Sequence, residues 1–183
     1  RNGQGGLGGF GARALDDSQP KYLNSPRTPV FDKGHILYGL HLAKESARQQ
    51  GIVIVEGDMD AVAAHQEGFN NVVASMGTAL TENQVAEIRR LTKDVTMALD
   101  ADVAGQQATL RSLESSWRVL QTQIAGRSRG TTLFQRPEML NLKIAVMPEG
   151  MDPDDLIHRS PDAWTQLIEE GPSYIEYLLK VLP

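Results

Sequence analysis

Cysteine is absent from the 183-residue sequence, and histidine is scarce. Without cysteine, neither a disulfide framework nor a thiolate zinc site can form. The four histidines also lack the spacing of a metal-binding pair: His35, His41, His65 and His158. We therefore expect no zinc, and we expect a cytoplasmic protein, because chains without disulfides suit a reducing compartment.

Long apolar runs are missing as well. No stretch approaches the roughly 20 apolar residues that cross a bilayer. The first residues are rich in glycine, where a signal peptide needs an apolar stretch. We therefore expect no membrane partner. The hydrophobic content of 40% is ordinary for a globular protein with a real core.

The charge is unevenly distributed along the chain, although the net charge is only -5. Residues 1–50 contain seven Lys/Arg against four Asp/Glu, whereas residues 51–183 contain eleven against nineteen. A basic lead-in followed by an acidic body favours a phosphate-contacting surface beside a metal-binding one. Charges that only solvate the surface would give the same totals, so this alternative stays open.

The hydrophobic pattern changes at Gly51. Residues 1–34 are dense in Gly, Pro, Asn and Ser and read as loops with short strands, and a helix over 35–50 follows. Beyond Gly51, short apolar runs alternate with amphipathic ones. We expect strands at 52–55, 71–75, 95–99 and 142–147, and helices at 59–67, from Thr81, at 104–123, 161–170 and 173–181. This alternation predicts an α/β fold with a mainly parallel sheet flanked by helices.

Acidic residues follow three of the expected strands. Glu56 and Asp60 follow the first, Asp100 and Asp102 follow the third, and the segment 148–155 follows the fourth. The carboxyl ends of parallel strands meet at one edge of a sheet, so these carboxylates would repel one another unless a cation compensated them. Oxygen ligands without His or Cys select Mg²⁺ or Mn²⁺, which suits phosphoryl chemistry.

Several of these residues also have plainer interpretations. An Asp-x-Asp turn alone is weak evidence for a metal, because Asp is common at turns and helix N-caps. We expect Asp58 simply to cap the helix that follows it. Trp117, Trp164 and Tyr177 lie in amphipathic segments, so we expect packing roles for them and do not assign them to a base-stacking platform.

Four segments in order resemble the Toprim domain of bacterial DnaG-type primases. They are "EGDMD" at 56–60, "NVVASMGTALTENQ" at 71–84, "LDADVAG" at 99–105 and "PEGMDPDDLI" at 148–157. Upstream, "GFGARALDD", "PKYLNSPRTPVFDKG" and "LYGLHLAK" resemble the end of that family's basic N-terminal subdomain. The resemblance covers about residues 8 to 170 and implies three parts. They are the end of the basic α+β subdomain (1–50), the Toprim domain (51–158) and the start of a helical subdomain (159–183).

The resemblance implies a nucleotidyltransferase that synthesises RNA primers on single-stranded DNA from ribonucleoside triphosphates, using Mg²⁺ or Mn²⁺. It also implies a replicative helicase as partner, through a region absent here. Toprim domains occur in topoisomerases and nucleases too. A fragment of one of these, or a non-catalytic DNA-binding module, is therefore an alternative, although the upstream segment favours primase.

The resemblance also assigns site residues by position. The metal acids fall on Glu56, Asp60, Asp100, Asp102, Asp152 and Asp154, and Glu56, Asp100 and Asp102 are the catalytic ones among them. The residues that contact nucleotide or template fall on Arg13, Lys21, Asn24 and Lys33.

The sequence departs from the family pattern in three places. Asp58 stands where an aromatic residue is usual, Ala101 stands where glycine is usual, and an arginine-containing insertion near 125–140 lengthens a link. The zinc-binding module, most of the basic subdomain and the helicase-binding region have no counterpart here. We therefore expect a catalytic-core fragment that binds metal and makes primers poorly or not at all.

Overall fold

A four-stranded parallel sheet forms the centre of the computed structural model, which describes residues 1–76, 79–101, 113–119 and 140–181. The strands are β3 (Ile52–Val55), β4 (Val72–Ala74), β5 (Asp94–Leu99) and β6 (Asn141–Val146), in the spatial order β4-β3-β5-β6. All neighbouring pairs are parallel. β3 and β5 are therefore central, and the loops after them open at the same edge of the sheet.

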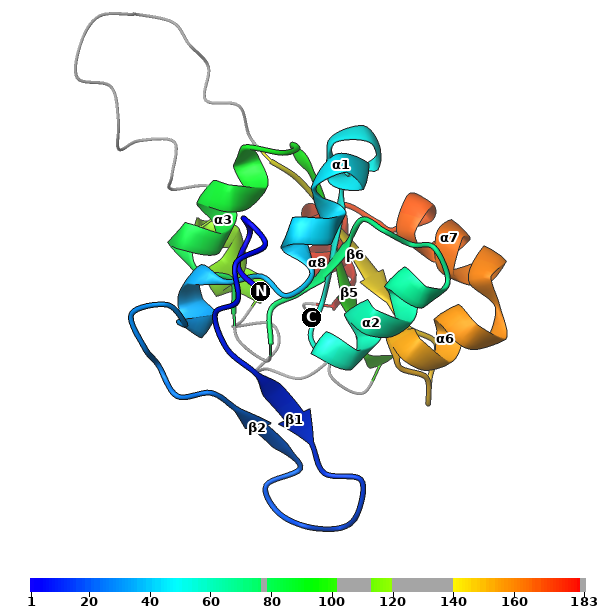
Figure 1. The fold of residues 1–183 in the computed structure, drawn as a ribbon. Coiled ribbons are helices and arrows are strands. Elements are labelled where there is room, and N and C mark those ends of the chain that lie inside the picture. The colour runs from blue at the N-terminus through cyan, green and yellow to red at the C-terminus, as the bar shows by residue number, and fades with distance from the viewer. Residues whose placement is uncertain (77–78, 102–112, 120–139, 182–183) are drawn as a thin grey trace, which may run out of the picture.

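Helices cover both faces of the sheet (Figure 1). Ile52 and Ile54 of β3 pack in one cluster with residues of α1 (Leu40–Gln50), α3 (Glu82–Arg89) and α8 (Tyr174–Val181). Val53 and Val55 pack in the other, with residues of α2 (Asp58–Gln66), α6 (Pro153–Arg159) and α7 (Pro161–Glu170). Side chains alternate along a strand, so an unbroken run of β-branched residues fills both cores. The predicted α/β architecture is confirmed.

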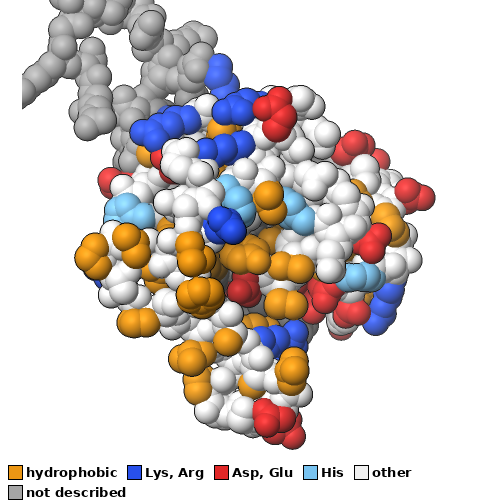
Figure 2. All heavy atoms as spheres, in the orientation of Figure 1, with side chains coloured by type: hydrophobic (Ala, Val, Ile, Leu, Met, Phe, Trp, Pro, Cys, Tyr) orange, Lys and Arg blue, Asp and Glu red, His pale blue; other side chains and the backbone are white. Residues whose placement is uncertain are grey.

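The lead-in forms a small antiparallel hairpin outside the main sheet. β1 (Gly11–Arg13) pairs with β2 (Tyr22–Asn24), and a short 3₁₀ helix, η1 (Lys33–His35), follows. The hairpin extends from the body of the molecule (Figure 1). Hydrophobic side chains gather over this part of the surface in Figure 2, and the large exposed ones are Leu7, Phe10, Leu15, Tyr22, Leu23 and Val30.

The helix expected over 35–50 begins later, at Leu40. His35 ends the 3₁₀ helix, Ile36 is extended, and the backbone of Tyr38 forms hydrogen bonds with Ala74 beside the sheet, which holds this segment out of a helix. Gly39 then adopts φ 80°, which a residue with a Cβ adopts at a cost, and it marks the turn into α1. A contact 36 positions away in sequence thus overrides the local helical period.

Most other elements lie where the sequence predicts them. The capping box of Thr81 and Gln84 is present at the start of α3. α6 is the exception: we expected a turn before 161, but Asp152 caps a short helix with Pro153 in its first turn. Residues 113–119 are helical, whereas the rest of the helix expected at 104–123 and almost all of the insertion at 125–140 lie outside the described residues. In the part of the chain that is described, no helix has the length and apolarity needed to cross a membrane.

Candidate functional site

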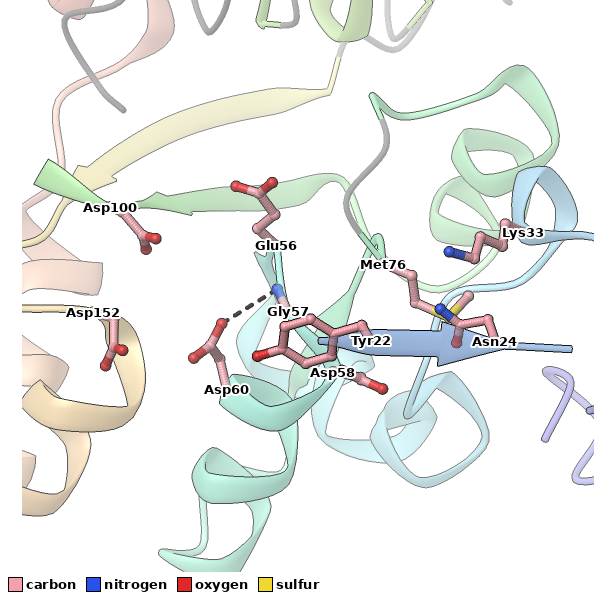
Figure 3. Close-up of a pocket in the computed structure, with 10 residues that line it drawn as sticks. All are labelled: Tyr22, Asn24, Lys33, Glu56, Gly57, Asp58, Asp60, Met76, Asp100 and Asp152. Carbon is pink, nitrogen blue, oxygen red and sulfur yellow. Dashed lines mark hydrogen bonds between the residues drawn. The ribbon is translucent and has the colours of Figure 1, made fainter. Parts of the chain in front are cut away.

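A pocket of about 540 Å³ opens where β3 and β5 end (Figure 3). One side carries acids that follow these strands or begin the neighbouring helices. The other side carries residues of the lead-in. The lining residues are Tyr22, Asn24, Lys33, Glu56, Gly57, Asp58, Asp60, Met76, Asp100 and Asp152.

Backbone geometry positions the acids of this pocket. Glu56 and Asp100 directly follow β3 and β5. Asp60 is the third residue of α2, and its Oδ2 accepts a hydrogen bond from the Gly57 N–H at 3.2 Å. Asp152 caps α6 by accepting the Asp155 N–H at 2.8 Å. Each carboxylate is therefore tied to the end of a regular element, and four of the six predicted metal acids line one pocket.

The electrostatics of the pocket are those of uncompensated negative charge. The pKa of Asp60 is raised from 3.8 to about 7, first by burial and then by the nearby carboxylates of Asp100 and Asp152, against a smaller lowering by the Gly57 N–H bond. A carboxyl group with such a pKa is held close to like charges in a poorly solvated position. A bound cation would reverse this effect, because it favours the ionised form.

Asp154 and Asp102 differ from the other four acids. Asp154 is turned toward His158, whose Nδ1 lies 2.7 Å from its Oδ1, and it does not line the pocket. Hydrogen bonding to the Asp154 carbonyl, and the nearby Asp154 carboxylate, raise the pKa of His158. Asp102 lies outside the described residues. Within the ranges that are described, no three His, Asp or Glu side chains converge closely enough to hold a metal ion.

The predicted basic residues divide into two pairs. Asn24 and Lys33 line the pocket opposite the acids. Arg13 and Lys21 lie beside Tyr22 on the hairpin, with Arg13 Cζ 5.6 Å and Lys21 Nζ 6.0 Å from the ring centroid. These two are not among the lining residues. Arg13 is directly opposite Tyr22 in the β1–β2 register, which places both side chains on one face of the hairpin.

Sequence reasoning missed four lining residues: Tyr22, Gly57, Asp58 and Met76. Alternation along a strand at 22–24 would have placed Tyr22 on the face of Asn24, so a signal for Tyr22 was present. Met76 has φ 57°, which is uncommon for a residue with a side chain and recurs at functional sites. The prediction that Asp58 caps α2 is wrong: Gly57 is the N-cap, and Asp60 supplies the side-chain oxygen.

Two family models match this chain in adjacent segments. The Toprim domain matches residues 50–125, and the N-terminal domain of the DNA primase catalytic core matches residues 1–44. The second match separates the primase family from other proteins that contain a Toprim domain.

Relatives and solved structures agree with these matches. The DNA primase of Clostridium acetobutylicum is 42% identical over 170 residues, 92% of this chain and 25% of the relative. That of Staphylococcus aureus is 36% identical over 185 residues, 100% of this chain and 28% of the relative. The chain thus spans about a quarter of the length of the curated relatives it matches.

Among solved structures, a DNA primase domain from Pseudomonas aeruginosa superimposes with a TM-score of 0.79 at 33% identity. The match covers 98% of this chain and 52% of that one. A DnaG primase catalytic domain bound to single-stranded DNA gives the same TM-score and identity, over 100% of this chain and 54% of that one. The chain belongs to the DnaG-type primase family, and it carries the Toprim domain together with the adjoining part of the N-terminal domain of the catalytic core.

Proposed function

We propose that this chain is the part of a primase catalytic core that binds a divalent metal and a ribonucleoside triphosphate for RNA primer synthesis on single-stranded DNA. The observation that carries the proposal is one pocket with carboxylates on one side and Lys33 and Asn24 on the other. A metal–triphosphate complex needs both kinds of group. The single-stranded DNA in the related catalytic-domain structure supports the choice of template.

The donor chemistry of the pocket fits Mg²⁺ or Mn²⁺. Glu56, Asp60, Asp100 and Asp152 offer oxygen atoms alone, and Mg²⁺ usually takes one or two carboxylates plus substrate phosphates and water. The raised pKa of Asp60 is the mark of a charge that still needs compensation. We propose that these four acids, with Asp102 and Asp154, hold the metal. When bound, the metal would neutralise charge on the α-phosphate and the departing pyrophosphate and favour loss of the 3′-hydroxyl proton.

The chain's own residues then hold the substrate. Lys33 provides a point charge for triphosphate oxygens, and the Asn24 amide can donate or accept a hydrogen bond. Arg13 and Lys21, further out on the hairpin, are suited to the template backbone, since Arg grips phosphate in a fork. Glu56 is exposed at the end of β3, where it can ligate metal or accept a proton.

The test is Mn²⁺-dependent binding of ATP, measured by calorimetry, with the Asp100→Asn/Asp102→Asn double variant for comparison. We expect the wild-type chain to bind and the variant to lose binding. Asp162→Asn/Glu169→Gln removes two exposed charges from α7 and should bind like the wild type. Equal binding by wild type and the site variant would contradict the proposal. Metal-dependent nicking of supercoiled plasmid without nucleotide would favour the nuclease alternative instead.

We further propose the division into 1–50, 51–158 and 159–183. The family matches at 1–44 and 50–125 support the first boundary, and β3 begins at Ile52. Trp164 of α7 and Tyr177 of α8 lie in the two cores of the sheet, so the third part packs on the Toprim domain. Since the chain spans about a quarter of its curated relatives, we propose that it synthesises primers weakly or not at all by itself and that helicase binding belongs to another region.

A further inference from the structure

Asp58 and Asp60 leave the first turn of α2 in different directions (Figure 3). Asp60 faces the other acids, as its interactions with Asp100 and Asp152 indicate. Asp58 faces the hairpin: its Oδ2 would lie 3.4 Å from a Cβ built on Gly11 of β1. Asp58 therefore belongs to the lead-in side of the pocket, together with Asn24 and Lys33, although it is a carboxylate.

Two opposite charges on this side of the pocket do not pair with each other. Within the described ranges, neither the Asp58 carboxylate nor the Lys33 ammonium forms a hydrogen bond or an ion pair, and both residues are partly buried. Partly buried charges normally find partners, because their desolvation is costly. In this pocket the missing partners are best supplied by a ligand with phosphate oxygens for Lys33 and hydrogen-bond donors for Asp58.

Asp58 lies at a junction between two hollows. A smaller cavity of about 50 Å³ under the hairpin shares Asn24, Asp58 and Met76 with the main pocket. Its other lining residues are mostly apolar or glycine, with one cation: Arg1, Gly9, Phe10, Gly11, Phe31, Ile36 and Tyr38. A ligand group that reaches Asp58 therefore meets the rings of Phe10 and Phe31 behind it, with the Tyr38 phenol close enough to interact with the Asp58 charge. A carboxylate in such a position accepts hydrogen bonds under weaker competition from water.

The identity of this ligand, a ribonucleoside triphosphate, rests on the proposed function. In the proposed complex, the triphosphate contacts Lys33 and the metal held by the acids. The ribose is the next group along the nucleotide, and Tyr22 offers a ring for the base. A carboxylate only accepts hydrogen bonds, and the sugar hydroxyls are donors. We propose that Asp58, assisted by Asn24, accepts a hydrogen bond from the ribose 2′-hydroxyl and so selects ribonucleotides over deoxyribonucleotides.

The test compares the affinities of ATP, 2′-deoxy-ATP and UTP in the presence of Mn²⁺ for the wild type, Asp58→Ala and Asp58→Asn. We expect Asp58→Ala to reduce the preference for ATP over 2′-deoxy-ATP about tenfold, the usual worth of a hydrogen bond to a charged group. The loss should fall on ATP, with 2′-deoxy-ATP bound as before or more tightly. Asp58→Asn keeps an acceptor oxygen and should lie between the two.

Asp162→Asn is the matched control, because Asp162 is an exposed acid in the first turn of α7. It removes the same charge and the same interaction with a helix dipole, and it should leave the preference unchanged. Equal weakening of ATP and 2′-deoxy-ATP would overturn the inference, as would a change only in the preference for ATP over UTP, which would indicate a contact with the base.

The proposed function fails separately from this inference. If the wild-type chain bound neither nucleotide, or if Asp100→Asn/Asp102→Asn bound ATP as well as the wild type, both would fall. If the wild type bound ATP through these acids while Asp58→Ala kept the wild-type preference, only the role of Asp58 would be wrong. Circular dichroism of each variant checks that the helices are retained.

Discussion

The charge of Asp60 should destabilise the metal-free protein at neutral pH, and Asp60→Asn tests this directly. The asparagine Oδ1 can still accept the Gly57 N–H bond, so the geometry of α2 is preserved while the charge is removed. In EDTA at pH 8 we expect the variant to be more stable than the wild type, although most single substitutions destabilise.

The sign follows from the raised pKa. The folded state holds the Asp60 proton up to a pKa of about 7, whereas the unfolded chain releases it near 3.8. The stabilisation from this proton is complete below about pH 4 and is lost as the pH rises through about 7. Asparagine does not titrate, so the advantage of the variant should grow between pH 5 and pH 8.

The magnitude follows from the same two values. An isolated group with these pKa values loses about 2.6 kcal/mol of stability between pH 5 and pH 8. Asp60 is partly exposed, so solvent screening reduces this effect. We expect the stability advantage of Asp60→Asn over the wild type to grow by about 1 to 2 kcal/mol from pH 5 to pH 8.

Urea unfolding followed by circular dichroism at pH 5 and pH 8, with EDTA and with millimolar Mn²⁺, measures the effect. Mn²⁺ should stabilise the wild type more than the variant, because the cation compensates the charge that the variant lacks. Asp162→Asn should show no such pH dependence. A difference in stability that is the same at both pH values would refute the reasoning, as would a variant less stable than the wild type at pH 8.

Three further predictions concern other residues of the site and the fold. Asp152→Ala should lower the free energy of unfolding by about 1 kcal/mol, because the α6 cap is lost. Asp152→Asn should keep the wild-type stability and still weaken Mn²⁺ binding. Equal stability of these two variants in urea would contradict the capping role. Lys33→Ala should weaken ATP binding and make it less dependent on salt, as measured by calorimetric titration at two ionic strengths. Lys180→Ala on α8 should change neither the affinity nor its salt dependence. Gly51→Ala should cost about 2 kcal/mol in urea, because φ 82° suits glycine almost alone and the new Cβ would lie 3.0 Å from the Asp94 carbonyl oxygen. Gly68→Ala shares the positive φ but meets no neighbouring atom, so a cost equal to that of Gly51→Ala would show that the clash contributes nothing.

Local patterns predicted the sheet well, because each of its signals is contained in a few consecutive residues. The apolar runs at 52–55 and 95–99 became β3 and β5, and the capping box at Thr81 marked the start of α3. The prediction of acids at one sheet edge also needed only parallel strands, and Glu56 and Asp100 do follow β3 and β5 into one pocket.

Contacts between distant residues explain the differences. The helix after 35 begins at Leu40 because Tyr38 is bound to Ala74 across a long separation in sequence. Asp152 faces the pocket and Asp154 does not, because the cap fixes the first and His158 pairs with the second. A short acidic segment read alone gives no reason to distinguish these two.

The sequence by itself determined the α/β class, the strand ends that carry acids and the family resemblance, since these depend on residue type and spacing. The tertiary structure alone decided which charges share a pocket. It brought Lys33 and Asn24 opposite the acids and turned Asp58 toward the hairpin. The physical reason is that a hairpin from residues 11–24 lies beside a pocket whose acids come from positions 56 to 152, a separation in sequence that no local pattern encodes.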